Sequence, residues 1–425
     1  MDTTEAPTLP SHGAPASSNS SDAPLDVLVI GAGQAGLSMA WYLARRGVRY
    51  LVIDAAPDIG HSWRTRWDSL KVFTSARYDG LPGEDFPGNP DSYPSKDQVA
   101  AYLTDYAHRH AFPILTDTRV TRLVPYAGGL AAHTTHGIVY ARRVVVATGA
   151  FHVPFLPVID ASFSVPAVHS SQYRRPSDLP HGRVLVVGGA NSGLQIAEDL
   201  AFSRQVVLAS GTNPPAVPQR PLGRDLFWWL TRLGFMEKGP DSRLARRMRA
   251  RGDLVVGTNR KELRAAGVDF RPRLVHASGR TATFADGTEV DVDAVVWATG
   301  FRPDYSWIDA PSVTEESGMP RHDGGRSLAV PGLWFLGLPW QRTRGSALLG
   351  FVQRDAAHLA AQMFDGAPIR RTVPELTVGR PPGPRLSTCP ALRHTMRAFE
   401  DRRTSDDATG PEGPHDGSTA CTGSA

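Results

Sequence analysis

Two glycine-rich loops, each directly after a continuously apolar run, constrain the fold of this chain more than any other feature. The first spans residues 27–36 (VLVIGAGQAG) and the second spans residues 184–193 (VLVVGGANSG). A short run without polar residues is typical of a parallel strand that is covered on both faces. A glycine loop between such a strand and a helix is typical of a βαβ unit that binds a dinucleotide. The duplication therefore predicts that the chain binds two dinucleotides.

An internal repeat extends this pattern along the chain. Each glycine loop is followed much later by a second apolar run that ends in Ala-Thr-Gly, at residues 144–149 and 295–300. We predict an α/β fold of two Rossmann-like dinucleotide-binding domains, each with three layers, the second inserted into the first. The expected boundaries are 25–155 and 301–375 for the first domain, and 156–300, with a helical insertion near 213–250, for the second.

Local signals indicate further elements of the first domain. Residues 36–47 read as a helix that ends at Gly47, because glycine is common just after a helix. Residues 48–54 then read as the second strand. A late strand is expected at 333–336, and the amphipathic run 346–363 is expected to form a last helix, opened by the turn at 344–346.

Both ends of the chain have a composition that does not favour a packed core. Residues 1–24 are rich in Ser, Thr, Pro and Ala, and residues 400–425 in Gly, Ser, Thr and Asp. Such segments carry too little apolar surface to offset the entropy of ordering. We expect a disordered tail over 1–24 and a largely disordered extension over 376–425. The N-terminus lacks the apolar core of a secretory signal, and no run reaches the ~20 apolar residues of a membrane span, which favours a cytoplasmic location.

Composition and charge argue against several other classes of protein. Hydrophobic residues make up 41% and charged residues 21% of the chain, as in soluble globular proteins. The net charge is +4, and no dense basic block with interleaved aromatic residues indicates nucleic-acid binding. The arginines between Arg243 and Arg251 are interpreted as a solvated helix face, with a membrane-surface or cofactor-phosphate role as the alternative. Cys389 and Cys421 form neither a Cys-x-x-Cys pair nor a metal-ligand pattern, which argues against a dithiol reductase and a metal site.

The first loop has the complete fingerprint of a dinucleotide site. Gly31 permits the tight turn, Gly33 lets the backbone approach a pyrophosphate, and Gly36 lets the helix pack on the strand. The N-terminus of the helix offers unpaired N–H groups and a positive dipole end to the phosphates. Asp54, at the end of the second strand, is placed to bind both ribose hydroxyls. An acid there disfavours a 2′-phosphate, so the site suits FAD or NAD rather than NADP.

The second loop departs from the fingerprint because Ala190 occupies its middle position. The strand at 205–210, which should carry the ribose determinant, ends without an acid. Ser210, Thr212, Arg220 and the neighbouring Arg204 offer groups for a 2′-phosphate, which favours NADPH over NADH. The alternative is that these arginines are ordinary surface charges.

A third motif, just before the second loop, narrows the interpretation. Residues 163–173, with Phe163, Val165, His169 and Tyr173, resemble the F-x-G-x-x-x-H-x-x-x-[FY] fingerprint of class B flavoprotein monooxygenases, with valine in place of glycine. Ala-Thr-Gly-Phe at 298–301 matches the A-T-G-[YF] signature of the same family. From about residue 25 to 365 the chain is most similar to the bacterial CzcO-like branch, and the runs at 63–70 and 93–97 add to the likeness.

This resemblance implies FAD in the first domain and NADPH in the second. Gly60 and Trp63 would lie beside the flavin, and Val120 would contact the adenine. Thr74 and Ser75 fall where flavin-containing monooxygenases keep an Asn near the reactive edge of the flavin, so Ser75 is a candidate catalytic residue. Gln341 is a candidate for the ribityl contact. The expected cofactor-binding residues are Gly31, Gly33, Gln34, Ala35, Gly36, Asp54, Trp63, Arg64, Val120, Ala147, Gly188, Ala190, Asn191, Ser192, Gly193, Ser210, Thr212, Arg220, Thr299, Gly300 and Gln341.

Two further features receive a structural and a functional interpretation. His169 is assigned a structural–mechanistic role: it steadies the linker between the domains and does no acid–base chemistry. The apolar run 227–230 in the insertion reads either as a helix that packs its apolar face inward or as a lid over the substrate. No catalytic triad or carboxylate pair stands out, which fits an enzyme whose cofactor carries the chemistry.

The interpretation that agrees best with these observations is an NADPH-dependent FAD monooxygenase. It would form a flavin C4a-(hydro)peroxide with O2 and oxygenate a soft N or S centre, or a carbonyl, of a small organic substrate. One alternative is a flavin oxidoreductase or oxidase that passes electrons from NADPH to an acceptor without oxygenating a substrate. Another is a non-catalytic, redox-sensing flavoprotein. Neither a nucleic acid nor stable membrane insertion is expected, and a homodimer is left open.

Overall fold

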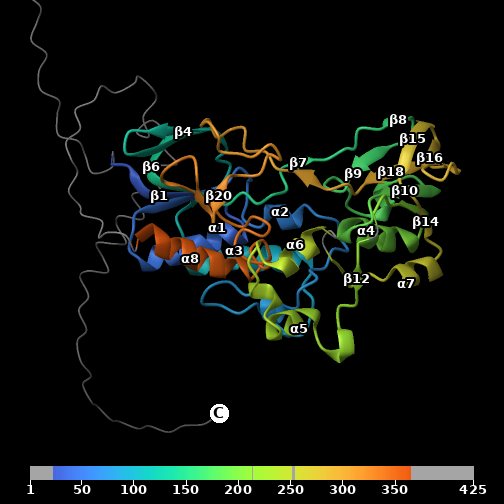
Figure 1. The fold of residues 1–425 in the computed structure, drawn as a ribbon, viewed down its shortest axis with the longest axis horizontal. Helices are drawn as coiled ribbons and strands as arrows, with labels where there is room; N and C mark the ends of the chain where they lie inside the picture. Colours follow the sequence, from blue (N-terminus) through green and yellow to red (C-terminus); the bar gives the residue numbers. More distant parts are fainter. Residues whose placement is uncertain (1–22, 213, 251–253, 365–425) are drawn as a thin grey trace, which may run out of the picture.

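The structure, a computed structural model, describes residues 23–212, 214–250 and 254–364. Two sheets lie side by side along the molecule, each with helices packed against it (Figure 1). This is the predicted α/β fold with two Rossmann-like units. Residues 1–22 and 365–425 lie outside the described residues; they include both cysteines, all of the predicted extension at 376–425 and most of the predicted tail at 1–24.

The first sheet has nine strands, and its central part is parallel. The strand order is β20-β21-β22-β6-β1-β2-β3, and the β4–β5 hairpin is joined to β6. The strands are β1 (Leu25–Ile30), β2 (Tyr50–Ile53), β3 (Ile114–Leu115), β4 (Val120–Tyr126), β5 (Gly129–Thr134), β6 (Gly137–Val146), β20 (His322–Asp323), β21 (Arg326–Ser327) and β22 (Leu333–Phe335). The helices of this part are α1 (Gln34–Arg45), α2 (His61–Arg64), α3 (Lys96–Arg109) and α8 (Val352–Phe364).

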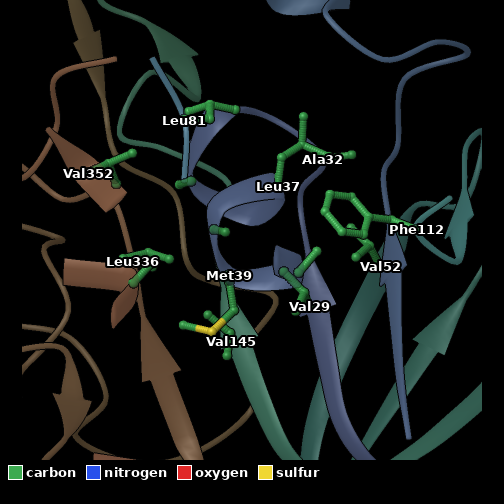
Figure 2. Close-up of a cluster of buried hydrophobic side chains, with 14 of the residues drawn as sticks. Val29, Ala32, Leu37, Met39, Val52, Leu81, Phe112, Val145, Leu336 and Val352 are labelled. Carbon is green, nitrogen blue, oxygen red and sulfur yellow. The ribbon is translucent and has the colours of Figure 1, made fainter. Parts of the chain in front are cut away.

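A buried apolar cluster holds α1 against the first sheet. Val29 and Val145 from adjacent strands meet Leu37 and Met39 from α1, and Val352 from α8 closes the cluster (Figure 2). These five side chains are at most 1% exposed. The continuously apolar strands are therefore covered on both faces, which is why they lack alternation. This core fixes the first glycine loop at the carboxyl end of β1.

The second sheet repeats this arrangement with five parallel strands. The order is β14-β11-β10-β18-β9, and a separate four-stranded sheet has the order β17-β16-β15-β8. The strands are β8 (Asp160–Phe163), β9 (Ala167–His169), β10 (Arg183–Val187), β11 (Gln205–Ala209), β14 (Asp269–Arg271), β15 (Leu274–Gly279), β16 (Thr281–Phe284), β17 (Glu289–Asp291) and β18 (Ala294–Trp297). Helices α4 (Asn191–Ala201) and α7 (Arg260–Ala265) belong to this part.

The chain passes between the two sheets twice, and the two passages run together. Strand β7 (Val153–Pro154), on the way out, pairs antiparallel with β19 (Phe301–Arg302), on the way back. A non-covalent contact adds to these links. Trp67 follows α2 in sequence, yet its side chain is buried in the apolar cluster of the second sheet.

The insertion between β11 and β14 packs against the first part of the molecule. It contains β12 (Ala216–Val217), α5 (Leu226–Arg232), α6 (Arg243–Ala250) and β13 (Val255–Val256). In α5, Phe227 is buried against Phe73, Tyr78 and Phe351. The run 227–230 thus packs its apolar face inward. In α6, the side chains of Arg243, Arg246 and Arg247 are exposed, as expected of a solvated face.

Some predicted boundaries shift by a few residues, and one prediction is wrong. Helix α1 begins two residues earlier than expected, and Gly47 follows it with φ of +60°. The last helix begins at Val352 rather than near residue 346, because residues 344–351 form turns. The helix N-terminus expected at 344–346 therefore lies at Val352 instead.

Candidate cofactor and active site

The two glycine loops have the same geometry at their first position. A Cβ on Gly31 would lie 2.6 Å from the carbonyl oxygen of Ala147, and a Cβ on Gly188 would lie 2.3 Å from that of Ala298. Both glycines also have positive φ, at +107° and +124°. Each loop thus requires glycine here so that the strand of its Ala-Thr-Gly motif can approach. The sequence repeat corresponds to a structural repeat.

The third position of each loop likewise leaves no room for a side chain. A Cβ on Gly36 would lie 1.8 Å from the carbonyl oxygen of Gly31, and a Cβ on Gly193 would lie 1.8 Å from that of Gly188. No side chain fits at these distances. Both glycines sit in the first turn of a helix and permit its close contact with the preceding strand.

The middle position, in contrast, faces open space in both loops. A Cβ on Gly33 would meet nothing within 4 Å. Ala190 has nearly the same backbone angles (φ −90°, ψ −174°) as Gly33 (φ −77°, ψ −173°), and it is exposed. Both residues precede the first turn of a helix, whose N–H groups suit an anion. Each open loop position, together with the first turn of the helix that follows it, forms a cradle that fits a pyrophosphate. The methyl group of Ala190 narrows the second cradle.

Asp54 lies beside the first cradle, as predicted for a ribose ligand. Its Oδ2 accepts a 2.6 Å hydrogen bond from the backbone N–H of Ala32, and its Oδ1 accepts one of 2.8 Å from Ala56. A carboxylate has about four lone-pair sites, so two remain for hydroxyl groups. Nearby, the indole N–H of Trp63 lies 3.4 Å from Oε1 of Gln34, which places both at this end of α1.

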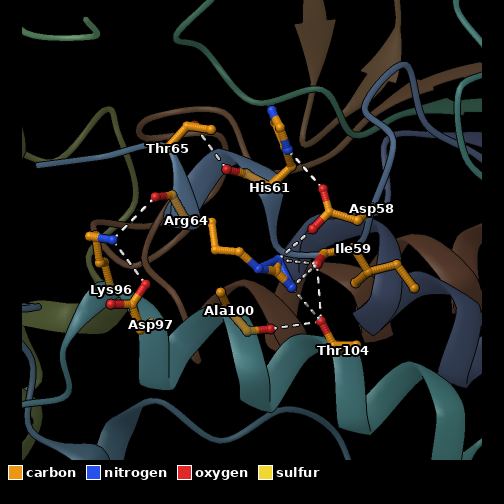
Figure 3. A network of polar contacts seen from close by, with 9 residues as sticks. All are labelled: Asp58, Ile59, His61, Arg64, Thr65, Lys96, Asp97, Ala100 and Thr104. Carbon is orange, nitrogen blue, oxygen red and sulfur yellow. Dashed lines mark hydrogen bonds and ion pairs between the residues drawn. The ribbon is translucent and has the colours of Figure 1, made fainter. Parts of the chain in front are cut away.

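Arg64, a predicted cofactor ligand, contacts protein groups in the structure. Its guanidinium forms a 2.7 Å ion pair with Asp58, donates to the carbonyl oxygen of Ile59 and contacts the hydroxyl of Thr104 (Figure 3). All these partners belong to the protein. Arg64 therefore fastens the α2 segment to α3.

Asn191 and Gln341 are likewise occupied by protein groups. The side chain of Asn191 donates to the carbonyl oxygen of Leu254 and accepts from the N–H of Val256, so it ties α4 to β13. The amide of Gln341 accepts from the N–H of Leu338 and donates to the carbonyl oxygen of Phe335, and the residue is only 3% exposed. Gln341 thus stabilises its own loop, and the ribityl contact stays a prediction.

The arginines expected at a 2′-phosphate also lie elsewhere. Arg220 donates to the carbonyl oxygen of Asp91 and lies 5.8 Å from the ring centroid of Tyr93, on the side of the first sheet. Arg204 donates to three backbone carbonyls of residues 176–180. The hydroxyl of Ser210 donates to the carbonyl oxygen of Thr212. In the structure, Arg220 and Arg204 therefore contact protein groups away from the second loop.

Two other arginines, which sequence reasoning missed, flank the second loop. Arg260 donates to the carbonyl oxygens of Gly189 (3.0 Å) and Pro214 (2.9 Å), and its buried Nε has no partner among the described residues. The Nε of Arg273 lies 2.7 Å from the position of a Cβ on Gly211. Strand β14 pairs parallel with β11, so residues that follow the two strands share one sheet edge. The parallel pairing of β14 with β11 is therefore the signal that could have identified Arg273 as a neighbour of the second loop.

The remaining predicted cofactor residues are spread over the two domains. Val120 begins β4, opposite Thr134, and Ser192 lies in the first turn of α4. The hydroxyl of Thr299 donates to the carbonyl oxygen of Phe155. Gly300 accepts from the N–H of Phe155 at 2.9 Å. The Ala-Thr-Gly motif of the second sheet thus fastens the two passages between the domains.

His169 contacts this same junction. Its Nε2 lies 3.0 Å from the carbonyl oxygen of Gly300, and its Nδ1 lies 3.0 Å from the hydroxyl of Ser171. Because a carbonyl only accepts, Nε2 carries the proton. Burial lowers the pKa of His169, and the nearby charge of Arg66 lowers it further. A neutral imidazole that holds the junction agrees with the structural role proposed for it.

Ser75 lies in a buried polar segment of the first domain. Its side chain is 0% exposed, and its hydroxyl has no partner among the described residues. The neighbouring Thr74 donates a 2.5 Å hydrogen bond to Asp79, which is also 0% exposed. Burial raises the pKa of Asp79 to about 7. Sequence reasoning missed Asp79, because only tertiary packing buries this acid.

Candidate metal sites and membrane-spanning helices are both missing from the described residues. No group of three or more His, Cys, Asp or Glu side chains in this part of the chain is arranged to hold a metal ion. Nor does any helix there have the length and apolar character needed to span a membrane.

Comparisons with known proteins agree with this geometry. A model of the pyridine nucleotide-disulphide oxidoreductase family matches residues 28–216. An uncharacterised CzcO-like oxidoreductase from Geobacillus kaustophilus is 42% identical over 338 residues, covering 79% of this chain and 97% of the relative. The CzcO oxidoreductase of Bacillus subtilis, also uncharacterised, is 37% identical over 341 residues, covering 80% and 99%.

A solved structure extends the likeness. The flavin-containing monooxygenase from Stenotrophomonas maltophilia superposes with a TM-score of 0.69 at 31% identity, covering 80% of this chain and 98% of that protein. The fold and the sequence thus point to the same group of enzymes. The chain belongs to the CzcO-like oxidoreductases, which are related to the class B flavin monooxygenases.

Proposed function

We propose that this enzyme is an NADPH-dependent FAD monooxygenase that oxygenates a soft N or S centre, or a carbonyl, of a small organic substrate. The observation that carries the proposal is the pair of open cradles at Gly33 and Ala190, each at the N-terminus of a helix. The 31% identical relative named as a flavin-containing monooxygenase supports the same chemistry.

The first loop and Asp54 would hold FAD, and the second loop would hold NADPH with Arg260 and Arg273 near its 2′-phosphate. When bound, FAD supplies the electron transfer and the activation of O2. The residues of the chain bind and orient both cofactors and exclude water. His169, through Gly300, would keep the two cofactor sites in register.

One observation favours a second candidate, an oxidoreductase that passes electrons from NADPH to an acceptor without oxygenation. Ser75 is shorter than the amide that the monooxygenase resemblance places there, and its buried hydroxyl has no protein partner. A site that holds activated oxygen less firmly would release hydrogen peroxide instead of transferring oxygen.

Rapid mixing separates the two candidates. The FAD-loaded protein is reduced anaerobically with NADPH or NADH and then mixed with O2 and a panel of amines, sulfides and ketones. We expect faster reduction by NADPH, and oxygenated product in near-stoichiometric ratio to NADPH for at least one substrate class. Hydrogen peroxide in stoichiometric yield with every substrate would favour the second candidate. No reduction by either nicotinamide would contradict both.

A further inference from the structure

Asp79 is a buried acid that the proposed binding of cofactors does not use. Its Oδ1 accepts the 2.5 Å hydrogen bond from Thr74, whereas its Oδ2 is buried and has no partner among the described residues. The hydroxyl of Ser75 is also buried and has no hydrogen-bond partner among the described residues. A buried ionised carboxylate without a compensating partner is costly. Asp79 therefore either holds a proton or meets a ligand at Oδ2.

Burial is the main cause that raises the pKa of Asp79. Part of this burial comes from the turn before α8, where a Cβ on Gly350 would lie 2.9 Å from the carbonyl carbon of Asp79. From α5, the carboxylate of Asp225 faces Asp79 and raises its pKa further. Tyr78 is its chain neighbour and has a raised pKa as well. Burial and Asp225 favour the protonated acid, and together they outweigh the hydrogen bond from Thr74, which lowers the pKa of Asp79.

The segment that carries Asp79 contributes to the same buried cluster as the first glycine loop. Val72 and Ala76 belong to the same buried cluster as Ala32 and Ala35 of the first glycine loop and Leu336 at the end of β22. Thr74 and Ser75 stand between the members of this cluster in sequence. The pair Thr74–Asp79 thus joins a hydroxyl in the segment that the resemblance places beside the flavin to a fully buried acid.

We propose that Asp79 stores the proton that oxygenation consumes and passes it on through the hydroxyl of Thr74. This rests on the proposed function, in which NADPH, a proton, O2 and substrate give NADP+, oxygenated substrate and water. Next to the ionised acid, the Thr74 hydroxyl donates to Oδ1; when Oδ1 carries the proton, the same short contact runs from the carboxyl O–H to Oγ1 of Thr74. The acid proton then passes from Oδ1 to Oγ1 while the Thr74 hydroxyl gives its own proton to the oxygen atom that leaves as water. No electrons move in this step, and the carboxylate regains a proton from solvent before the next cycle. Asp79 acts through Thr74 and is a positioning residue.

The pKa of Asp79, raised by burial to about 7, agrees with this role. A group with a pKa near the working pH both holds and releases a proton readily. The charged and titratable groups around it are few: Asp225, Tyr78 and, bonded to Asp225, Tyr93.

The test uses two readouts on the FAD-loaded full chain. Infrared difference spectra across a pH titration should contain a protonated-carboxyl band that disappears near pH 7 and is missing in Asp79→Asn. Asp355→Asn is the matched control, because it removes another buried carboxyl, bonded to Arg342, and should retain the band. The second readout is the pH dependence of oxygenated product formed per NADPH oxidised.

The wild-type yield should fall as the pH rises through about 7. Asp79→Asn and Thr74→Val should lower the oxygenation rate on the order of 100-fold and abolish this pH dependence, while anaerobic reduction by NADPH stays within a few-fold. Thr74→Ser, which keeps the hydroxyl, should behave like the wild type. FAD content and circular dichroism verify that each variant is folded.

The two hypotheses fail in different ways. A band that persists in Asp79→Asn, or a wild-type pH profile in Asp79→Asn and Thr74→Val, overturns the role of Asp79 and leaves the proposed function intact. A wild-type protein that is reduced by NADPH but forms no oxygenated product overturns the proposed function, and the proton delivery with it.

Discussion

The hydroxyl of Tyr93 donates a 2.9 Å hydrogen bond to the carboxylate of Asp225, so a residue of the first domain holds the insertion of the second. The other oxygen of Asp225 accepts from the N–H groups of Phe227 and Trp228 at the start of α5. The first turn of this helix is thus fixed against the first domain by one acid. Its loss should loosen α5 without unfolding either sheet.

Tyr93→Phe removes this bond while Asp225 still caps the helix. A typical hydrogen bond contributes about 1 kcal/mol, so amide exchange in α5 should accelerate roughly fivefold, with little change in the sheets. Hydrogen–deuterium exchange with mass spectrometry measures this. Tyr126→Phe, on exposed strand β4, is the control and should leave α5 unchanged. Equal exchange in α5 for both variants would show that the aromatic contacts of Phe227 alone hold the helix.

The three glycines of the first loop should respond differently to alanine. Gly31→Ala forces a methyl against the carbonyl of Ala147 and should destabilise the protein by about 1–3 kcal/mol. Gly33→Ala meets no protein atom, so the thermal stability of the apoprotein should change little while FAD affinity falls. Thermal unfolding and FAD titration separate the two effects. Ala190→Gly, the reverse change in the second loop, should tighten NADP+ binding; weaker binding would contradict the assignment of that loop.

Arg273→Gln should reduce the preference for NADPH. A charge-assisted hydrogen bond contributes about 1.5–3 kcal/mol, so the affinity for 2′,5′-ADP should fall roughly 10- to 100-fold while that for AMP is unchanged. Calorimetric titration of the FAD-loaded protein measures both. Arg220→Gln is the matched control, since Arg220 lies beside Tyr93 and not at the second loop. A larger loss of 2′,5′-ADP affinity in Arg220→Gln than in Arg273→Gln would instead indicate that Arg220 binds the 2′-phosphate.

Asp79 should also make stability depend on pH. Its pKa is raised from 3.8 to about 7 in the folded protein, so the folded state binds its proton more tightly than the unfolded state. The resulting stabilisation is complete below about pH 4 and is lost as the pH rises through about 7. Between about pH 4 and pH 7, the free energy of unfolding of the wild type should therefore fall by a few kcal/mol relative to that of Asp79→Asn. Chemical denaturation at several pH values measures the difference, and parallel pH curves for the two proteins would contradict the raised pKa.

Much of the fold could be predicted because the decisive signals are local. Gly31 and Gly36 lie next to the strand and helix that require them, and the same holds for Gly188 and Gly193. The apolar runs and the two Ala-Thr-Gly motifs then indicate that the unit is repeated and that the second copy is inserted into the first. The start of the last helix was misplaced because amphipathic spacing at 346–351 is compatible with turns as well as with a helix.

The side-chain partners could not be predicted in the same way. Whether Arg64 or Gln341 faces a cofactor depends on acceptors from other segments, such as Asp58 for the first and the Phe335 carbonyl for the second. Arg273 comes beside Gly211 only through the pairing of β14 with β11. Asp79 looks like an ordinary turn residue in the sequence, and only tertiary packing makes it a buried acid.

The pairing of β7 with β19 has a consequence for how such a chain originates. The second unit enters and leaves at one place, and β6 and β22, on either side of this interruption, are neighbours in the first sheet. A copy of an ancestral coding segment inserted at a single position of the gene can therefore produce this architecture without breaking any strand of the host. Contacts such as Trp67 in the second core would then be later substitutions that convert two tethered neighbours into one enzyme.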